Sequence, residues 1–114
     1  MTTRQAALHY AVGRIRAATR CRRSPKVAIV GAGFGGLGAA VALRRAGVDD
    51  IVIIEGSDGV GGTWRSNTYP GAACDVQSHF YSFSFALNKS WSRTYARQPE
   101  ILQYLESVAD DFDL

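Results

Sequence analysis

One segment of the chain, residues 26–55, constrains the fold more than any other. A short apolar run, Val27–Val30, leads directly into the glycine-rich sequence GAGFGG, and a second apolar run, Ile51–Ile54, ends on an acidic residue. Between the two runs, apolar residues recur at the spacing of an amphipathic helix. The order of strand, glycine turn, helix and strand predicts a βαβ unit with two parallel strands, and therefore an α/β fold.

Each glycine of this turn has a physical task in holding a dinucleotide. Gly31 permits the tight turn, Gly33 lets the backbone approach a pyrophosphate, and Gly36 lets the helix pack closely on the strand. The pyrophosphate then lies at the N–H groups and positive dipole end of the helix. Glu55, nineteen residues after Gly36, can accept hydrogen bonds from the hydroxyls of an adenosine ribose. A glycine turn used only for packing would not explain why an acid ends an apolar strand.

Length and composition limit the chain to one ordinary globular domain at most. It has 114 residues, of which 46% are hydrophobic and 20% charged. No apolar run approaches the roughly 18 residues of a membrane span. The two cysteines, Cys21 and Cys74, do not have the spacing of a metal or redox pair. We therefore predict no metal site and a reducing, cytoplasmic location.

The net charge of +3 belongs to one end of the chain. Residues 1–26 hold seven Lys and Arg residues and no acid, whereas residues 27–114 hold six basic and ten acidic residues and carry a net charge of −4. The part expected to fold is therefore mildly acidic. This distribution gives no case for nucleic-acid binding.

Residues 1–25 form a predicted basic helical extension before the first strand. One stripe recurs there at steps of three and four residues: Leu8, Val12, Ile15 and Thr19. Packing of this helix on the body of a larger protein is the simplest interpretation. Weak peripheral contact with anionic lipid and a role as an organelle transit peptide are open alternatives, because the segment is rich in Arg and free of acids.

The second half of the chain consists of turn signals, aromatic residues and one helix. Residues 57–74 are predicted to be a loop, and long loops of this kind are usually functional. The sequence HFYSFSF at residues 79–85 is compatible with a short strand. A helix is predicted from Gln98, with proline in its first turn. Its apolar stripe consists of Ile101, Leu105, Val108 and Phe112.

The predicted sheet is incomplete. Two parallel strands do not make a stable doubly wound sheet, whose third strand should lie beside the first. The apolar stripe of the last helix would also have little to pack on. We therefore interpret residues 26–114 as the truncated N-terminal part of a larger domain.

A second pair of glycines follows the acid, in the sequence GGTW at residues 61–64, and YPGAACD follows at residues 69–75. In flavoproteins, small residues and free N–H groups at this place let the loop approach the diphosphate and ribityl chain of FAD. Together with GAGFGGL, Glu55, HFYSFSF and QPEI, these motifs resemble the class B flavoprotein monooxygenases, and most closely the Baeyer–Villiger monooxygenases. The resemblance covers about residues 26–114.

The resemblance implies a Rossmann-like βαβ FAD-binding portion of a flavoprotein with two dinucleotide-binding domains. It implies FAD contacts for Gly31, Gly33, Phe34, Gly36, Glu55, Gly62, Thr63, Trp64, Asp75 and Tyr81. It also implies a catalytic role for Asp75, near the flavin and the nicotinamide of NADPH. Many members have a basic residue where this chain has Ala73, which leaves the local NADP contacts open.

The resemblance further implies a reaction. In such enzymes NADPH reduces FAD, O2 adds to the flavin, and the resulting C4a-peroxyflavin inserts an oxygen atom into an apolar ketone. N- or S-oxygenating flavin monooxygenases share the motifs and remain an alternative, as does an FAD-binding fragment without activity. The second glycine fingerprint, the histidine-containing signature and the active-site arginine of the family do not occur in these 114 residues, so we expect them alone to be inactive.

Several residues also have purely structural interpretations. Packing beside a glycine turn is an alternative explanation for Trp64, and capping of the turn or helix that follows is an alternative for Asp75. Cys74 fits a small buried residue, and His79 fits a packed or surface histidine. The aromatic residues predicted to lie in the core, one of them touching flavin, are Phe80, Tyr81, Phe83 and Phe85. Those predicted to lie in the core or at an interface are Trp91 and Tyr95.

Overall fold

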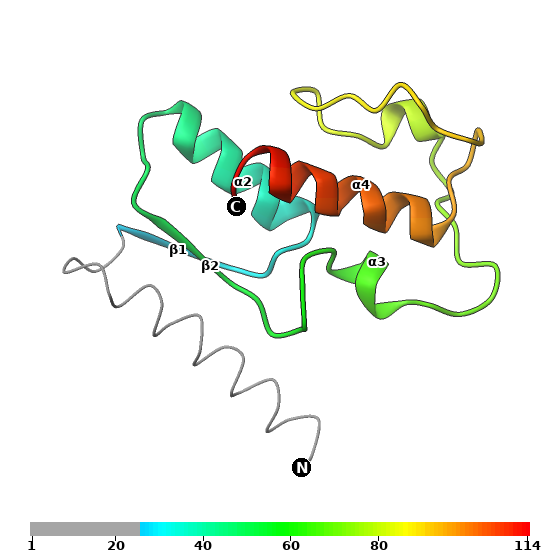
Figure 1. Ribbon diagram of the computed structural model, residues 1–114, viewed down its shortest axis with the longest axis horizontal. Coiled ribbons are helices and arrows are strands. Elements are labelled where there is room, and N and C mark those ends of the chain that lie inside the picture. Colours follow the sequence, from blue (N-terminus) through cyan, green and yellow to red (C-terminus); the bar gives the residue numbers. More distant parts are fainter. Residues whose placement is uncertain (1–25) are drawn as a thin grey trace, which may run out of the picture.

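The computed structural model describes residues 26–114, so the extension predicted at residues 1–25 lies outside the described residues. These residues form two strands, three α-helices and a short 3-10 helix (Figure 1). Their order along the chain is β1 (Val27–Val30), α2 (Phe34–Arg45), β2 (Ile51–Ile54), α3 (Thr63–Ser66), η1 (Ser78–Phe80) and α4 (Gln98–Asp111). The predicted α/β fold class is confirmed.

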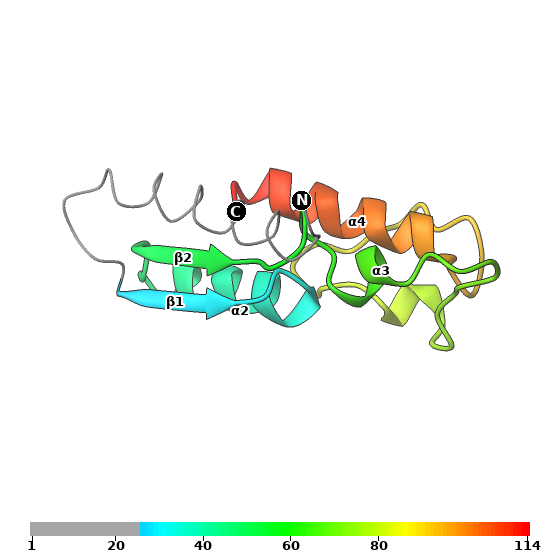
Figure 2. The same ribbon diagram turned by 90° about the horizontal axis from the view of Figure 1, so that it is seen from below.

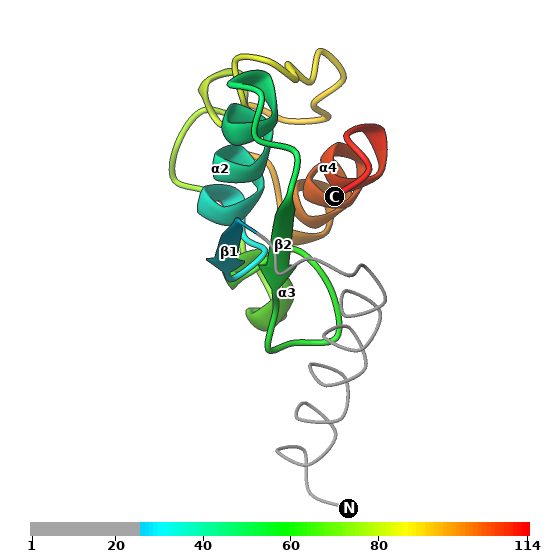
Figure 3. The same cartoon turned by 90° about the vertical axis from the view of Figure 1, so that its left-hand side faces the viewer.

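The two strands pair in parallel, as the βαβ pattern predicted. Val27 lies opposite Ile51 and Val30 lies opposite Ile54. Helix α2 covers one face of this sheet, and α4 lies alongside α2 on the side of β2 (Figure 3). Among residues 26–114 the sheet has these two strands alone, and Val30 is 85% exposed. The sheet is therefore incomplete in the way we expected.

Helix α2 buries one apolar face, as the amphipathic spacing predicted, and ends beside a glycine. Leu37, Ala40 and Val41 are fully or almost fully buried. The helix ends at Arg45, and Gly47 follows with a positive φ of +82° while its N–H donates to the carbonyl of Arg44 at 3.0 Å. A glycine at this place ends a helix without strain because it has no Cβ.

The apolar stripe of α4 is buried along most of its length and half-buried at Phe112, so our expectation that it would have little to pack on is wrong. Ile101 and Leu105 are completely buried, and Val108 is 2% exposed. Helix α2 and the aromatic segment before α4 pack against this stripe. The guanidinium of Arg44 also donates to the carbonyls of Phe112 and Asp113, which fastens the end of α4 to α2.

The structure corrects one local prediction in the second half of the chain and decides one question that the sequence left open. The predicted loop at residues 57–74 contains the short helix α3, which begins directly after Gly62. Residues 79–85, whose sequence was compatible with a short strand, do not form one: the segment begins in η1 and ends in an isolated bridge between Phe83 and Ala86. It has no strand to pair with, and the N–H of Phe83 donates instead to the hydroxyl of Tyr104 at 2.7 Å.

The aromatic residues of this segment divide between core and surface. Tyr81, Phe83, Phe85 and Trp91 pack against the buried cluster around α4, as predicted. Phe80 is 73% exposed, so its prediction as a core residue is wrong; it faces the exposed ring of His79 at 4.1 Å between centroids. Its place at the end of the tight turn η1 directs it away from the core.

No helix among residues 26–114 is both long enough and apolar enough to cross a bilayer.

Candidate dinucleotide-binding site

The first glycine turn has the geometry that a dinucleotide fingerprint requires. Gly31 has a φ of +96°, which other residues rarely adopt, and its N–H donates to the carbonyl of Ile54 at 2.7 Å. A Cβ on Gly36 would overlap the carbonyl group of Gly31 and approach the side chain of Ile29 at 3.5 Å. Helix α2 therefore begins in direct contact with the turn, and only glycine fits this contact.

The N-terminus of α2 is open to an anionic ligand. Its cap residue, Gly33, has no side chain that could bond to the first N–H groups of the helix, and the first turn contains no acidic residue. The first N–H groups of a helix have no partner within the helix, and the helix dipole makes this end positive. In Figure 2 both strands point toward this end of the molecule, so the site lies at the carboxyl ends of the parallel strands, where α/β proteins bind ligands.

The second glycine turn lies directly against the first. Gly61 and Gly62 have φ angles of +132° and +53°. The N–H of Gly61 donates to the carbonyl of Ala32 at 2.9 Å, and a Cβ on Gly62 would lie 3.0 Å from the Cα of Gly33. Two motifs that the sequence analysis treated separately thus form one continuous glycine surface.

A cavity of about 360 Å³ opens beside these two turns. It is lined by Gly33, Phe34, Gly61, Gly62, Thr63, Trp64 and Tyr81. The indole N–H of Trp64 donates to the hydroxyl of Tyr81 at 3.1 Å, and the rings of Phe34 and Tyr81 form a T-shaped pair with 4.8 Å between centroids. Trp64 therefore both packs and lines the cavity. Six of the ten predicted site residues meet here, from three separate segments.

Glu55 supports the first turn from the end of β2. Its two carboxylate oxygens accept hydrogen bonds from the N–H groups of Ala32 at 2.6 Å and of Ser57 at 2.7 Å. Partial burial alone would raise the pKa of Glu55, but these backbone hydrogen bonds outweigh it and hold the pKa below its ordinary value of 4.5. Each oxygen of a carboxylate can accept a second hydrogen bond, so this support is compatible with the predicted contact to a ribose.

Asp75 lies apart from the cavity. It is exposed and is not among the cavity-lining residues, although its neighbour Cys74 is buried as predicted. The capping alternative has no support at η1, where Gln77 is the cap residue and makes no side-chain hydrogen bond. The catalytic role of Asp75 stays a prediction.

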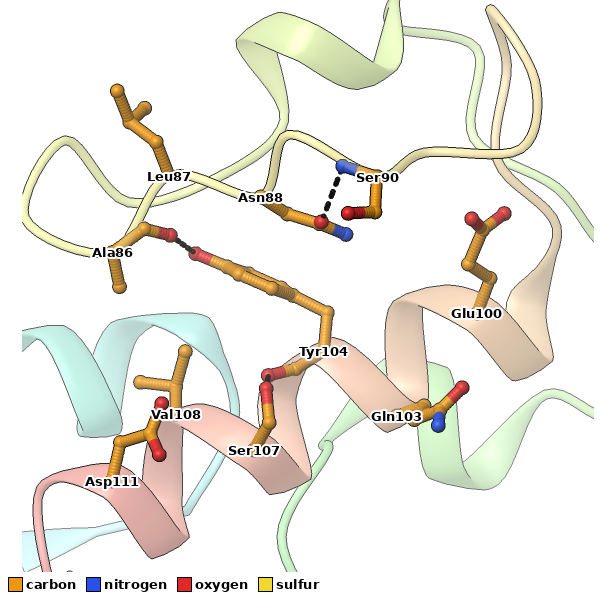
Figure 4. Close-up of a pocket in the computed structure, with 10 residues that line it drawn as sticks. All are labelled: Ala86, Leu87, Asn88, Ser90, Glu100, Gln103, Tyr104, Ser107, Val108 and Asp111. Atoms are coloured by element: carbon orange, nitrogen blue, oxygen red, sulfur yellow. Dashed lines mark hydrogen bonds between the residues drawn. The ribbon is translucent and has the colours of Figure 1, made fainter.

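A larger cavity, of about 410 Å³, lies between residues 86–90 and α4 (Figure 4). The side chain of Tyr104 reaches from α4 to residue 86, where its hydroxyl donates to the carbonyl of Ala86 at 2.8 Å. The side chain of Asn88 accepts a hydrogen bond from the N–H of Ser90. None of the predicted site residues lines it. The candidate site is therefore the smaller cavity beside the glycine turns, which six of the predicted site residues line.

The residues that hold the second glycine turn in place belong to no recognisable sequence motif. No role was predicted for Arg65 or Glu106, and Gln98 and Leu102 were predicted only as the start and part of the apolar side of the helix, although Gln98, Leu102 and Glu106 all face α3. Their spacing of four residues places them on one face of a helix. This spacing was visible in the sequence, but nothing in it showed that the face meets the glycine turn.

The fold and the site define a dinucleotide-binding βαβ unit. A family model described as an NAD(P)-binding Rossmann-like domain matches residues 29–98. This match covers more than half of the chain, and the chain belongs to that family.

Within this broad family, the chain is similar to individual monooxygenases. A Baeyer–Villiger monooxygenase of Streptomyces coelicolor is 62% identical over 89 residues, which are 78% of this chain and 17% of that protein. The structure of a steroid monooxygenase bound to NADP shares 51% identity and a TM-score of 0.72, covering 77% of this chain and 18% of that one. An FAD-bound form of OTEMO shares 35% identity and a TM-score of 0.71, covering 80% and 18%.

These likenesses confirm the resemblance to Baeyer–Villiger monooxygenases that the motifs indicated. The chain spans less than a fifth of the length of the curated relatives it matches, with 17% and 18% for two of them.

Proposed function

We propose that residues 26–114 form the FAD-binding portion of an NADPH- and O2-dependent flavin monooxygenase of the Baeyer–Villiger type, which oxygenates an apolar ketone. The observation that carries this proposal is the contact between the two glycine turns beside an aromatic-walled cavity. A nicotinamide dinucleotide requires only the first turn, whereas the second turn provides a further surface for the flavin half of FAD. The match to Baeyer–Villiger monooxygenases over most of the described residues supports the same conclusion.

The residues present fit FAD. Gly31 and Gly36 meet without a Cβ between them, and the free N–H groups of the helix N-terminus would bind the diphosphate. Glu55 would accept hydrogen bonds from the adenosine ribose. Thr63, Trp64 and Tyr81, together with Phe34 and Gly62, would surround the flavin side. When bound, FAD supplies the redox chemistry by which electrons from NADPH activate O2.

We assign the catalytic role among these residues to Asp75, because the YPGAACD motif of the resemblance contains it. Although Asp75 does not line the cavity, the resemblance places its carboxylate near the reacting part of the flavin in the whole protein. There it would tune a nearby cation, and that cation would stabilise the negative charge that develops during attack on the ketone. A cytoplasmic location, and the place of residues 26–114 as the first part of a larger domain, belong to the same proposal.

The proposal is tested with the full-length protein. We expect it to purify with bound FAD, to oxidise NADPH faster when a ketone is added, and to convert the ketone into an ester or lactone, detected by mass spectrometry. Formation of N-oxides or sulfoxides without ester would favour the N- or S-oxygenating alternative. Bound FAD without any NADPH oxidation would show an FAD-binding protein without activity, and absence of FAD would overturn the proposal.

A further inference from the structure

Helix α4 presents one stripe of side chains to the second glycine turn and to α3. The stripe consists of Gln98, Leu102 and Glu106, which are four residues apart and so lie above one another on one face. The side-chain amide of Gln98 donates to the carbonyl of Trp64, and Gln98 is 7% exposed. A Cβ on Gly61 would overlap the end of the Leu102 side chain. The stripe is therefore in direct contact with the turn that lines the cavity.

Arg65 connects this stripe to the loop before the glycine pair. Its Nε donates to the carbonyl of Val60 at 2.6 Å, and its Nη2 donates to the carboxylate of Glu106 at 2.6 Å. Its Nη1 lies 3.5 Å from the carboxylate of Asp58. The guanidinium covers Gly59, where a Cβ would approach it at 2.9 Å. One side chain thus binds three groups in three directions.

The bond from Arg65 to Val60 closes a ring around the two glycines. The backbone N–H of Arg65 also donates to the carbonyl of Gly62 at 3.0 Å, so the glycine pair is held on both sides. Gly61 and Gly62 both have positive φ, and glycine loses more conformational freedom on folding than any other residue. Without a brace, this turn would sample many conformations. An exposed ion pair alone contributes little to stability. A planar guanidinium that is held at three points, however, restricts the conformations open to the backbone that it binds.

We propose that Arg65, clamped by Glu106, is a positioning residue that sets the conformation of the Gly61–Trp64 turn and thereby the affinity for the flavin half of the cofactor; this rests on the proposed function. The clamp acts on the turn and does not touch the reacting atoms. Its removal lowers affinity for FAD and loosens residues 59–66, and it leaves the first glycine turn unchanged.

The test uses Arg65→Met, Arg65→Lys and Glu106→Gln in the full-length protein. Asp110→Asn is the matched control, because Asp110 is an exposed carboxylate on the same helix. FAD affinity is measured by titrating the apoprotein with FAD and following flavin fluorescence, and local opening is measured by hydrogen exchange. We expect Arg65→Met to raise the Kd for FAD roughly tenfold, the equivalent of one lost charge-assisted hydrogen bond.

The other variants separate the effect of the charge of Arg65 from the effect of its guanidinium shape and of its partner Glu106. Arg65→Lys keeps the charge beside Glu106 but cannot reproduce the guanidinium fork, so we expect an intermediate Kd. Glu106→Gln keeps the shape of the side chain and should raise the Kd less than Arg65→Met. In all three variants, amide exchange should rise in residues 59–66 and stay unchanged in β1 and α2, while Asp110→Asn behaves as the unmodified protein.

An unchanged Kd and unchanged exchange at residues 59–66 in a folded Arg65→Met protein would overturn the inference. If Arg65→Met does not fold, the same two readings on Glu106→Gln decide, since this change preserves volume. A uniform rise of exchange over the whole molecule would also overturn it, because the residue would then support overall stability alone. Failure of the unmodified protein to bind FAD would instead contradict the proposed function, and normal FAD binding by the variants would contradict only the clamp.

Discussion

Gly33 and Gly62 are 29 residues apart in the sequence, and their backbones touch: a Cβ on Gly62 would lie 3.0 Å from the Cα of Gly33. This contact joins the turn at the start of α2 to the turn at the start of α3. The cavity lined by Phe34, Trp64 and Tyr81 opens beside it. Any side chain placed between the two glycines would change the shape of the cavity, and this contact can be tested directly.

Replacement of Gly62 by alanine should separate the two turns. Its φ of +53° and ψ of −125° lie in a region that costs residues other than glycine about 1–3 kcal/mol, and the added methyl group would press on Gly33. We expect a loss of this size in the free energy of unfolding and weaker FAD binding, measured by urea denaturation and flavin fluorescence. Gly56→Ala is the control, since a Cβ there meets nothing within 4 Å. Equal FAD affinity in the two variants would contradict a role for the contact.

Gly36 and its neighbour Gly35 should respond in opposite ways to the same substitution. A methyl group on Gly36 would overlap the carbonyl of Gly31, and overpacking of this kind destabilises by about 1–3 kcal/mol or more. A methyl group on Gly35 meets nothing within 4 Å, and alanine in a helix is favoured over glycine by roughly 0.5–1 kcal/mol. Urea denaturation of both variants checks this prediction. Similar stabilities would show that the helix does not pack on the turn as described.

Glu55 should make stability depend on pH. Its pKa is lowered in the folded protein, so its contribution is present above the ordinary value of 4.5 and is lost as the pH falls through the lower, folded value. At neutral pH, Glu55→Gln weakens the hydrogen bonds to Ala32 and Ser57, and we expect a loss of about 1.5–3 kcal/mol. The gap between the two proteins should close in acid. A gap that stays constant between neutral pH and pH values below 4.5 would contradict this account.

Substitution of Asp75 separates its catalytic role from a structural one. Because the side chain is exposed, we expect Asp75→Asn to change the free energy of unfolding by no more than about 0.5 kcal/mol. If the carboxylate tunes a cation at the reaction centre, kcat of the full-length enzyme should fall at least roughly tenfold, as electrostatic contributions to catalysis do. Loss of stability together with full activity would favour the capping interpretation.

Most of the secondary structure could be predicted from the sequence. The two apolar runs predicted β1 and β2 with the bounds that are observed, GAGFGG between them predicted the turn into α2, and Gln98-Pro99 predicted the start of α4. These elements depend on neighbours close in sequence: apolar periodicity, glycine turns and a proline in the first turn. Helix α3 and the turn η1 escaped prediction, because each is short and its backbone is held by contacts from distant segments.

The same division applies to the site. The types and order of the site residues follow from chain-local motifs, since a close approach to phosphate requires glycine wherever it occurs. Their meeting in one cavity depends instead on contacts over long sequence distances, such as those of Gly33 with Gly62, Trp64 with Tyr81, and Arg65 with Glu106. Such contacts form only when α4 packs against α2 and α3. Packing of a helix face is decided by the shapes of both partners, and a spacing pattern along one segment contains information about only one of them.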